Sequence, residues 1–201
     1  MTENQTLPLL QRAGVGSFFR PRDVLPLGVT HHDIQRLLVE GRAERAGHGL
    51  YRLADVEATE METIAMVVSA APHAIVCLLS ALRVHDIGTQ SPHQVWLAID
   101  RKARRPARLP AQVRIVRFSG QMLTYGVITR TMQGVAVRIT TPARTVVDCF
   151  RYRNKIGLDV AMEALRDAVR SRRATVGEID RAATVCRIRT VIGPYLEALS
   201  A

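Results

Sequence analysis

The 201-residue sequence lacks any apolar stretch long enough to cross a lipid bilayer. Its apolar runs, such as residues 64–71, are far shorter than the roughly 20 residues that a membrane-spanning helix needs. The start of the chain, residues 2–5, is polar and lacks the basic charge of a secretory signal. We therefore expect a cytoplasmic protein that does not bind membranes.

Cysteines and aromatic residues are both scarce. The three cysteines, Cys77, Cys149 and Cys186, are far apart, and each lies in an apolar run. An odd and unclustered set argues against a disulfide framework and against a zinc site, and it suits a reducing compartment. Aromatic residues make up only 4% of a chain that is 47% hydrophobic, which predicts a core of Leu, Val and Ala. We expect the cysteines to be small core residues.

The common catalytic patterns are absent as well. The sequence contains no G-x-S-x-G, no H-E-x-x-H and no glycine loop that would cradle phosphates. The adjacent histidines His31 and His32 point to different sides of a helix and have no third ligand nearby. We therefore expect no metal, no cofactor and no small-molecule substrate.

The charge is mostly of one sign and is unevenly distributed. The chain carries 28 Lys and Arg against 18 Asp and Glu, a net charge of +10. Residues 1–56 hold 7 Arg and 6 acidic residues, a net charge of +1, and residues 57–201 carry the remaining +9. A basic chain favours an acidic partner, most simply nucleic acid. The basic second part serves nucleic acid, another acidic partner or solubility, and composition alone leaves these three open.

Residues 14–53 have the pattern of a winged helix-turn-helix. Gly28 allows a tight turn with positive φ between two short helices. Thr30 caps the second of these helices, with Asp33 as the acidic half of a capping box, and Gly41 follows its end. Its apolar residues fall on one face at helical spacing, namely Ile34, Leu37 and Leu38.

Two short strands complete the pattern. Residues 43–46 and 50–53 can pair, with Gly47-His48-Gly49 as the turn, and residues 6–13 are expected to form the first helix. The second helix of such a helix-turn-helix presents its N-terminal half to the major groove of DNA. Sequence-specific DNA binding is therefore the leading interpretation, and residues 1–56 are predicted to be the DNA-binding domain.

Ten residues of this domain are predicted to contact DNA. The exposed start of the second helix offers side chains for base edges, because Gln can pair with adenine and Arg with guanine. The wing and the start of the preceding helix offer cations for phosphates or the minor groove. The predicted contacts are Arg20, Arg22, Thr30, His31, His32, Gln35, Arg36, Arg45, His48 and Arg52. The alternative is that these faces are merely solvated.

Residues 57–201 are predicted to form a second domain of the mixed α/β class that ends in a helical bundle. Helices are expected over residues 56–70, 74–85, 141–152 and 158–170. A further helix is expected to begin at a capping box formed by Thr175 and Glu178. The last helix is expected over residues 188–199, with an interruption at Gly193-Pro194. Strands are expected over residues 94–99, 113–118, 126–132 and 134–139, the last two joined by a tight Gln133-Gly134 turn.

The densest positive segment is RKARRPAR at residues 101–108. Pro106 and Pro110 keep it out of a strand interior, which predicts an arginine-rich loop. Its predicted role is a second basic contact with nucleic acid or with an acidic partner, through Arg101, Lys102, Arg104, Arg105 and Arg108. A solvated loop is the alternative.

Several short motifs and one long run together resemble a known family. The motifs are a glycine–phenylalanine pattern, Gly28-Val29, Arg36-Leu37-Leu38 with Gly41, and Gly49-Leu50-Tyr51. The run is ITTPARTVVDCFRYRNKIGLDVAMEALRDAVRSRRAT at residues 139–175, followed by PYLEAL. On these residues the chain resembles the AbiEi-type antitoxins of type IV toxin–antitoxin systems, which are linked to abortive phage infection.

This resemblance implies two roles. The N-terminal domain would bind double-stranded DNA repeats in the promoter of its own operon and repress it. The C-terminal domain would counter a partner toxin that resembles nucleotidyltransferases, either by contact or indirectly. Within the long run, we interpret Thr141 as a helix cap and Arg144 and Asp148 as an i,i+4 ion pair rather than as toxin-neutralising residues.

Two other functions stay open. Asp100-Arg101-Lys102 at a strand end resembles the D-x-K half of a nuclease metal site, with Asp86 as an upstream acid. Such a tripeptide often arises by chance, and no further acid lies on the adjoining strands. The other hypothesis is a protein whose C-terminal domain works only by binding the toxin protein.

Overall fold

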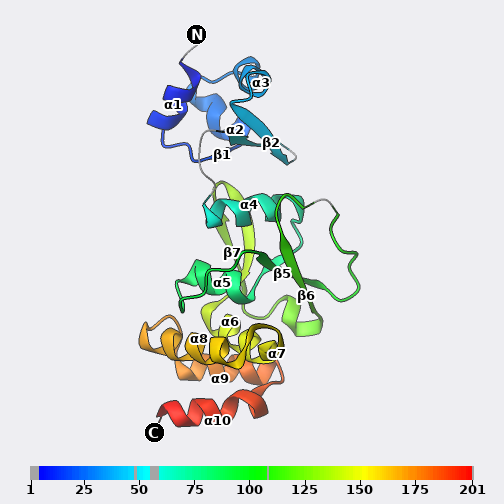
Figure 1. Cartoon of the computed structure of the whole chain (residues 1–201), viewed down its shortest axis with the longest axis vertical. Coiled ribbons are helices and arrows are strands. Elements are labelled where there is room, and N and C mark those ends of the chain that lie inside the picture. The colour runs from blue at the N-terminus through cyan, green and yellow to red at the C-terminus, as the bar shows by residue number, and fades with distance from the viewer. Residues whose placement is uncertain (1–4, 48, 55–58, 108, 201) are drawn as a thin grey trace. The chain divides into compact units, whose positions relative to one another are not determined.

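The computed structural model describes residues 5–47, 49–54, 59–107 and 109–200. The chain has a mixed α/β fold with two sheets, as predicted (Figure 1). It divides into two compact units. The first extends mainly to Pro72 and includes Thr131–Ala136, and the second is built mainly from His73–Ala107, Ala111–Arg130 and the residues from Val137 onward. The domain boundary predicted after residue 56 falls among residues 55–58, outside the described residues, and stays a prediction.

The first unit contains the predicted winged helix-turn-helix. Its helices are α1 (Thr6–Arg12), α2 (Pro21–Val24), η1 (Leu25–Leu27) and α3 (His31–Val39). Its strands are β1 (Phe18–Phe19), β2 (Ala43–Gly47) and β3 (Leu50–Leu53), which form an antiparallel sheet in the order β1-β3-β2. The buried residues that hold these elements together include Leu10, Phe19, Val24, Ile34, Leu37 and Leu53. This core lies beneath α3 and fixes which face of that helix is left exposed.

The helix α4 (Glu60–Ala70) begins later than the predicted residue 56. Thr59 caps it, because its side chain accepts a hydrogen bond from the backbone of Glu62, 3.3 Å away, and the Glu62 side chain accepts one from the Thr59 backbone. The Glu62 carboxylate, which is buried, also accepts the Ser17 hydroxyl. A capping box therefore sets the start of this helix at Glu60.

The second sheet has the order β6-β5-β4-β8-β7. Its strands are β4 (Ile75–Val76), β5 (Val95–Asp100), β6 (Val113–Phe118), β7 (Val127–Met132) and β8 (Val135–Thr140). The four predicted strands are present, and Gln133 and Gly134 both have positive φ in the turn between the last two. The strand β4 replaces the start of a predicted helix. Ile75 and Val76 lie between β5 and β8, so two distant partners override the helical pattern.

The helices of the second unit gather beside this sheet (Figure 1). They are α5 (Leu78–His85), α6 (Pro142–Arg151), α7 (Arg153–Ile156), α8 (Leu158–Arg170), α9 (Val176–Val185) and α10 (Arg189–Ser200). Every residue of α6 from Arg144 to Phe150 is buried. A helix that is buried on all sides lies at the centre of its core, and α6 contacts α5, α8 and α9.

One prediction about the bundle is wrong in detail. The predicted interruption of the last helix at Pro194 is absent, because α10 continues through this proline. Ile192 and Leu196, on either side of it, are both buried, so their packing outweighs the hydrogen bond that proline cannot donate. In α8, helical spacing places Leu158 on the apolar stripe, but its side chain is exposed.

All three cysteines are buried and unpaired, as small core residues are expected to be. Among the helices that the structure describes, none combines the length and the apolarity that crossing a membrane would require.

The stripe on α8 gives a direct test of the second unit's core. Leu165 is fully buried, so Leu165→Ala should lower the free energy of unfolding by about 2–5 kcal/mol. The neighbouring Arg166 is exposed, and Arg166→Ala should change it by less than about 0.5 kcal/mol. Urea denaturation of the two variants checks this. Equal midpoints would show that α8 does not pack as described.

Candidate nucleic-acid interface

The helix α3 starts where the sequence predicts, at a complete capping box. The Asp33 carboxylate accepts hydrogen bonds from the Thr30 backbone at 2.9 Å and from the Thr30 hydroxyl at 2.6 Å. The backbone of Asp33 donates in return to the Thr30 hydroxyl at 3.1 Å. These bonds, with a smaller effect of Arg36, lower the pKa of Asp33 from its usual value. The carboxylate is therefore charged at neutral pH, and its contribution to stability is lost only when strong acid protonates it.

The two sides of α3 differ sharply in exposure. Asp33, Ile34 and Leu37 are buried, whereas His31, His32 and Gln35 are exposed. Gly28 precedes the helix with a φ of 88°, a conformation that favours glycine. The polar side chains predicted to contact base edges therefore lie on the free face of a helix whose other face is anchored in the core.

Arg36 differs from the expectation that it would be a free side chain on this face. Its guanidinium donates to Asp33 at 2.9 Å and to the Thr6 hydroxyl of α1 at 3.3 Å, and Glu40 lies 3.9 Å away. Its side chain is only 21% exposed. Thr6 lies 30 residues earlier in the chain, so no local pattern could indicate this contact. Arg36 thus joins α1 to α3, and its assignment as a base contact stays a prediction that competes with this role.

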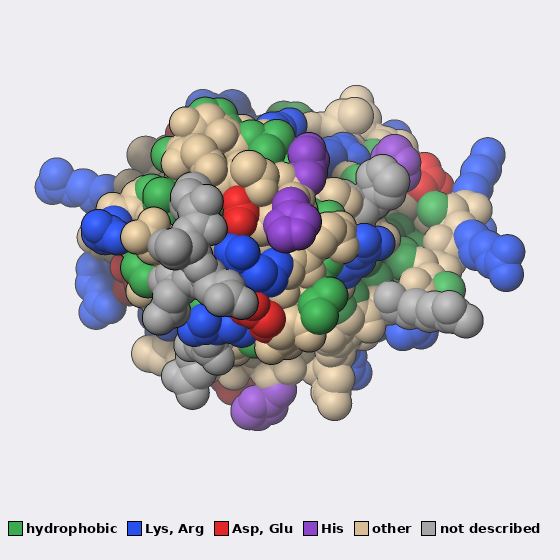
Figure 2. Space-filling model, turned by 90° about the horizontal axis from the view of Figure 1, so that it is seen from above, with side chains coloured by type: hydrophobic (Ala, Val, Ile, Leu, Met, Phe, Trp, Pro, Cys, Tyr) green, Lys and Arg blue, Asp and Glu red, His purple; other side chains and the backbone are tan. Residues whose placement is uncertain are grey.

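The remaining predicted contacts of the first unit are cations around α2 and the wing. Arg22 is exposed and lies 3.6 Å from Asp23, while Arg20 is half-buried. On the wing, Arg45 is exposed, and Arg52 donates to Glu44 at 2.8 Å. His48 lies outside the described residues. On the face seen in Figure 2, Lys, Arg and His side chains are visible together with some hydrophobic ones, and acidic side chains are few.

The second basic segment is an exposed loop, as predicted. Arg101, Lys102, Arg104 and Arg105 are all exposed, and Arg108 lies outside the described residues. Arg117 contacts the start of the loop, because its guanidinium donates to the carbonyls of Asp100 at 2.9 Å and Ala103 at 2.5 Å. Arg117 therefore holds the start of a loop that carries four exposed cations.

The nuclease hypothesis gains no support from the geometry. One Asp100 oxygen accepts the backbone N–H of Lys102 at 2.7 Å, which is an ordinary local turn. Asp86, the other proposed acid, pairs instead with Arg173 at 3.3 Å. The described part of the chain contains no group of three His, Cys, Asp or Glu side chains that could hold a metal ion.

Arg144 and Asp148 form the ion pair expected from their spacing, but it lies inside the core. The two side chains are 2.9 Å apart and both are fully buried. Arg144 also donates to the carbonyls of Tyr125 at 2.6 Å and Met122 at 3.2 Å. Burial raises the pKa of Asp148 to about 6, although Arg144 opposes this shift. The pair therefore ties η2 (Gly120–Leu123) and the turn after it to α6.

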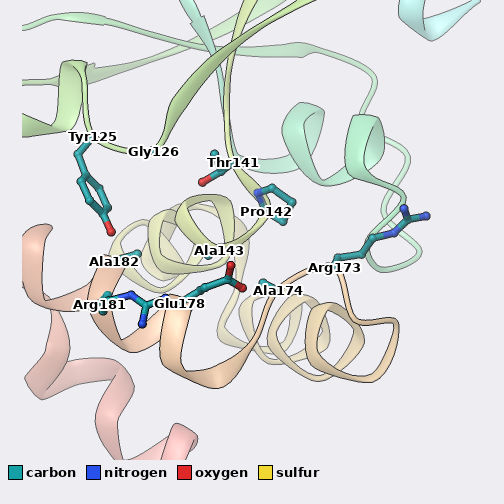
Figure 3. Close-up of a pocket in the computed structure, with 10 residues that line it drawn as sticks. All are labelled: Tyr125, Gly126, Thr141, Pro142, Ala143, Arg173, Ala174, Glu178, Arg181 and Ala182. Atoms are coloured by element: carbon teal, nitrogen blue, oxygen red, sulfur yellow. The ribbon is translucent and has the colours of Figure 1, made fainter.

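The residues just before Arg144 line a cavity of about 420 Å³ (Figure 3). Thr141, Pro142 and Ala143 of the long family-like run line it, and Tyr125 faces them from the turn after η2. A side chain at Gly126 would lie 2.8 Å from the Cβ of Arg144, so that turn requires glycine. The run thus supplies core contacts through Arg144 and Asp148 and surface through the residues before them.

Comparison with known proteins identifies the first unit. Residues 7–54 match the family described as "Transcriptional regulator, AbiEi antitoxin". This segment is therefore similar to the AbiEi antitoxin family. The family is described as one of transcriptional regulators, which supports a DNA-binding antitoxin role. The AbiEi match does not reach residues 139–175, so the assignment of that run to the same family stays a prediction.

One solved structure extends the comparison to most of the chain. The RV2827C protein from Mycobacterium tuberculosis aligns with a TM-score of 0.54 at 12% identity, over 88% of this chain and 71% of that one. At this identity the likeness shows the fold alone. No curated protein matches the sequence.

The contacts of Arg36 lead to a prediction that separates structure from recognition. Because Arg36 holds α1 and Asp33 while Gln35 is exposed, Arg36→Ala should lower the free energy of unfolding by about 1 kcal/mol. Gln35→Ala should leave it unchanged within about 0.5 kcal/mol. Chemical denaturation followed by circular dichroism measures both. If Arg36→Ala is as stable as the parent, its guanidinium is free and the assignment to a bridging role is wrong.

Proposed function

We propose that this chain is a DNA-binding autorepressor and the antitoxin of a type IV toxin–antitoxin system. Its N-terminal unit binds repeats in its own promoter, and its second unit counters a nucleotidyltransferase-like toxin. The observation that carries the proposal is α3, which projects an exposed polar face from a winged helix-turn-helix in the segment that matches the AbiEi family. We place the protein in the cytoplasm, where such DNA is found.

The geometry of α3 supports contact with the major groove. A recognition helix inserts its N-terminal residues into the groove, and His31, His32 and Gln35 lie on the first turns of α3. Gln35 has the chemistry to pair with adenine through two hydrogen bonds. The nearly neutral N-terminal domain leaves much of the phosphate contact to other cations, and we assign part of it to the exposed loop of Arg101, Lys102, Arg104 and Arg105.

We further propose that the antitoxin role is non-catalytic and belongs to the C-terminal domain predicted from the sequence, residues 57–201. Asp100 and Asp86, the acids that a nuclease would use, are engaged by the Lys102 backbone and by Arg173. The domain boundary near residue 56 is part of this proposal. Whether the second unit binds the toxin or acts indirectly is decided by co-purification of the two proteins.

The two roles should separate by domain. Gln35→Ala should lower promoter affinity by about 1–3 kcal/mol, or about 5- to 150-fold, because alanine cannot form the two hydrogen bonds to the base. The same variant, made from an unrelated promoter, should still protect cells that express the toxin. Gel shifts with the promoter fragment and a growth assay measure the two effects.

Gln121→Ala, an equally exposed glutamine in the second unit, is the matched control and should change neither readout. Loss of protection by Gln35→Ala at a normal protein level would mean that DNA binding is itself the antidote. If Gln35→Ala binds the promoter as tightly as the parent, the assignment of α3 to the major groove is wrong.

If the arginine-rich loop contacts DNA, it should contribute to the salt dependence of DNA affinity. Replacing Arg101, Lys102, Arg104 and Arg105 of the full chain by Gln should reduce the slope of log affinity against log salt by about 0.9 for each phosphate that these cations neutralise. Fluorescence anisotropy at several salt concentrations measures the slope. An unchanged slope would show that this loop does not touch DNA and that its charge serves another partner or solubility.

A further inference from the structure

Val39, the last residue of α3, is the most exposed large hydrophobic side chain among the described residues. It is 88% exposed, whereas the others in this class, such as Leu158 and Leu27, reach only 41% and 39%. A valine that is almost fully exposed contributes nearly nothing to the core. It also lowers helix propensity relative to alanine, because its branched Cβ restricts the side chain. The fold of the unit therefore gives no reason for a valine at this position.

The position of Val39 on the helix supplies such a reason. Successive residues of an α-helix are rotated by about 100°, so residues four apart lie nearly above one another. Val39 follows Gln35 by four residues and His31 by eight, and all three are exposed. Asp33, Ile34 and Leu37 occupy the opposite, buried face. Val39 thus extends the face of His31 and Gln35 to the C-terminal end of α3, one turn beyond Gln35.

The chemistry of this face indicates which group Val39 contacts. Val39 is a single exposed apolar group, with Gln35 one turn before it and the exposed Glu40 directly after it, and one valine is too small an apolar patch for a protein interface. The major groove offers a matching group, because thymine alone carries a 5-methyl that packs against apolar side chains. Four residues of helix rise about 6 Å, which is close to two base-pair steps of about 3.4 Å.

We propose that Val39 is a specificity-determining residue that packs against the 5-methyl group of a thymine in the operator. The proposal rests on the proposed function, since it requires α3 to lie in the major groove. The operator then carries, within one or two base pairs, a base contacted by Gln35 and a thymine contacted by Val39. A·T-rich half-sites follow if the Gln35 base is adenine.

The test removes one methyl group at a time from the DNA. The probe is the promoter duplex protected by the full chain in a footprint, with each thymine replaced singly by deoxyuridine. At the Val39 position this change should weaken binding of the parent protein about fourfold, the factor that corresponds to ~0.8 kcal/mol for one buried methyl. Val39→Ala should weaken binding to the unmodified duplex by a similar factor, and it should show no further loss with deoxyuridine at that position.

Two controls keep the result interpretable. Val39→Ala should fold with an unchanged or higher melting temperature, because alanine is the better helix former. Ile128→Ala removes a side chain that is 36% exposed on β7 of the second unit, and it should bind every duplex as the parent does.

The possible outcomes separate a failure of the thymine contact from a failure of the proposed DNA-binding function. If the parent protects the promoter but no deoxyuridine effect depends on residue 39, the thymine contact is wrong while the DNA-binding function stands. If Val39→Ala instead turns a dimer of the free protein into a monomer, the valine serves a second copy of the chain and the proposal is overturned. If the parent does not protect the promoter at all, the proposed function fails first, and the inference falls with it.

Discussion

The start of α3 and the position of Arg36 both depend on one carboxylate, that of Asp33. It accepts two hydrogen bonds from Thr30, which start α3 at His31, and a third from Arg36. The third bond keeps the Arg36 guanidinium beside α1 instead of on the free face. The outer surface of α3 is consequently left to uncharged or weakly basic side chains and to Val39. Under our proposal, this face contacts bases by hydrogen bonding and methyl packing, and cations elsewhere contact the phosphates.

The second unit depends on a different buried charge. Arg144 and Asp148 are fully enclosed, and the arginine also satisfies two backbone carbonyls and lies 4.9 Å from the centre of the Phe118 ring. Removing one partner of such a pair would leave a buried charge without compensation, which costs several kcal/mol. The pair therefore belongs to the scaffold that supports the surface around Thr141 and Pro142, and the antitoxin role must be sought on that surface or elsewhere on the exterior.

Local chemistry makes much of the fold predictable. The capping boxes of Thr30 with Asp33 and of Thr175 with Glu178, and the Gln133-Gly134 turn, each depend on residues within a few positions of one another. Features set by distant partners escape prediction: the strand β4, which two other strands stabilise, the continuation of α10 through Pro194, and the contact of Arg36 with Thr6. Whether a site residue is exposed likewise depends on distant partners. The sequence places Gln35 and Arg36 on one helix but cannot show that only Gln35 is free.

The central claim is that the outer face of α3 binds the promoter while the second unit serves the antitoxin role. An NMR titration of the isotope-labelled full chain with the promoter duplex tests it most directly, because backbone amides report contacts throughout the molecule. We predict that the largest shifts fall on residues 31–39 and on the wing strands, with smaller shifts in the loop of residues 101–107. Shifts confined to the second unit, with α3 unaffected, would contradict the account.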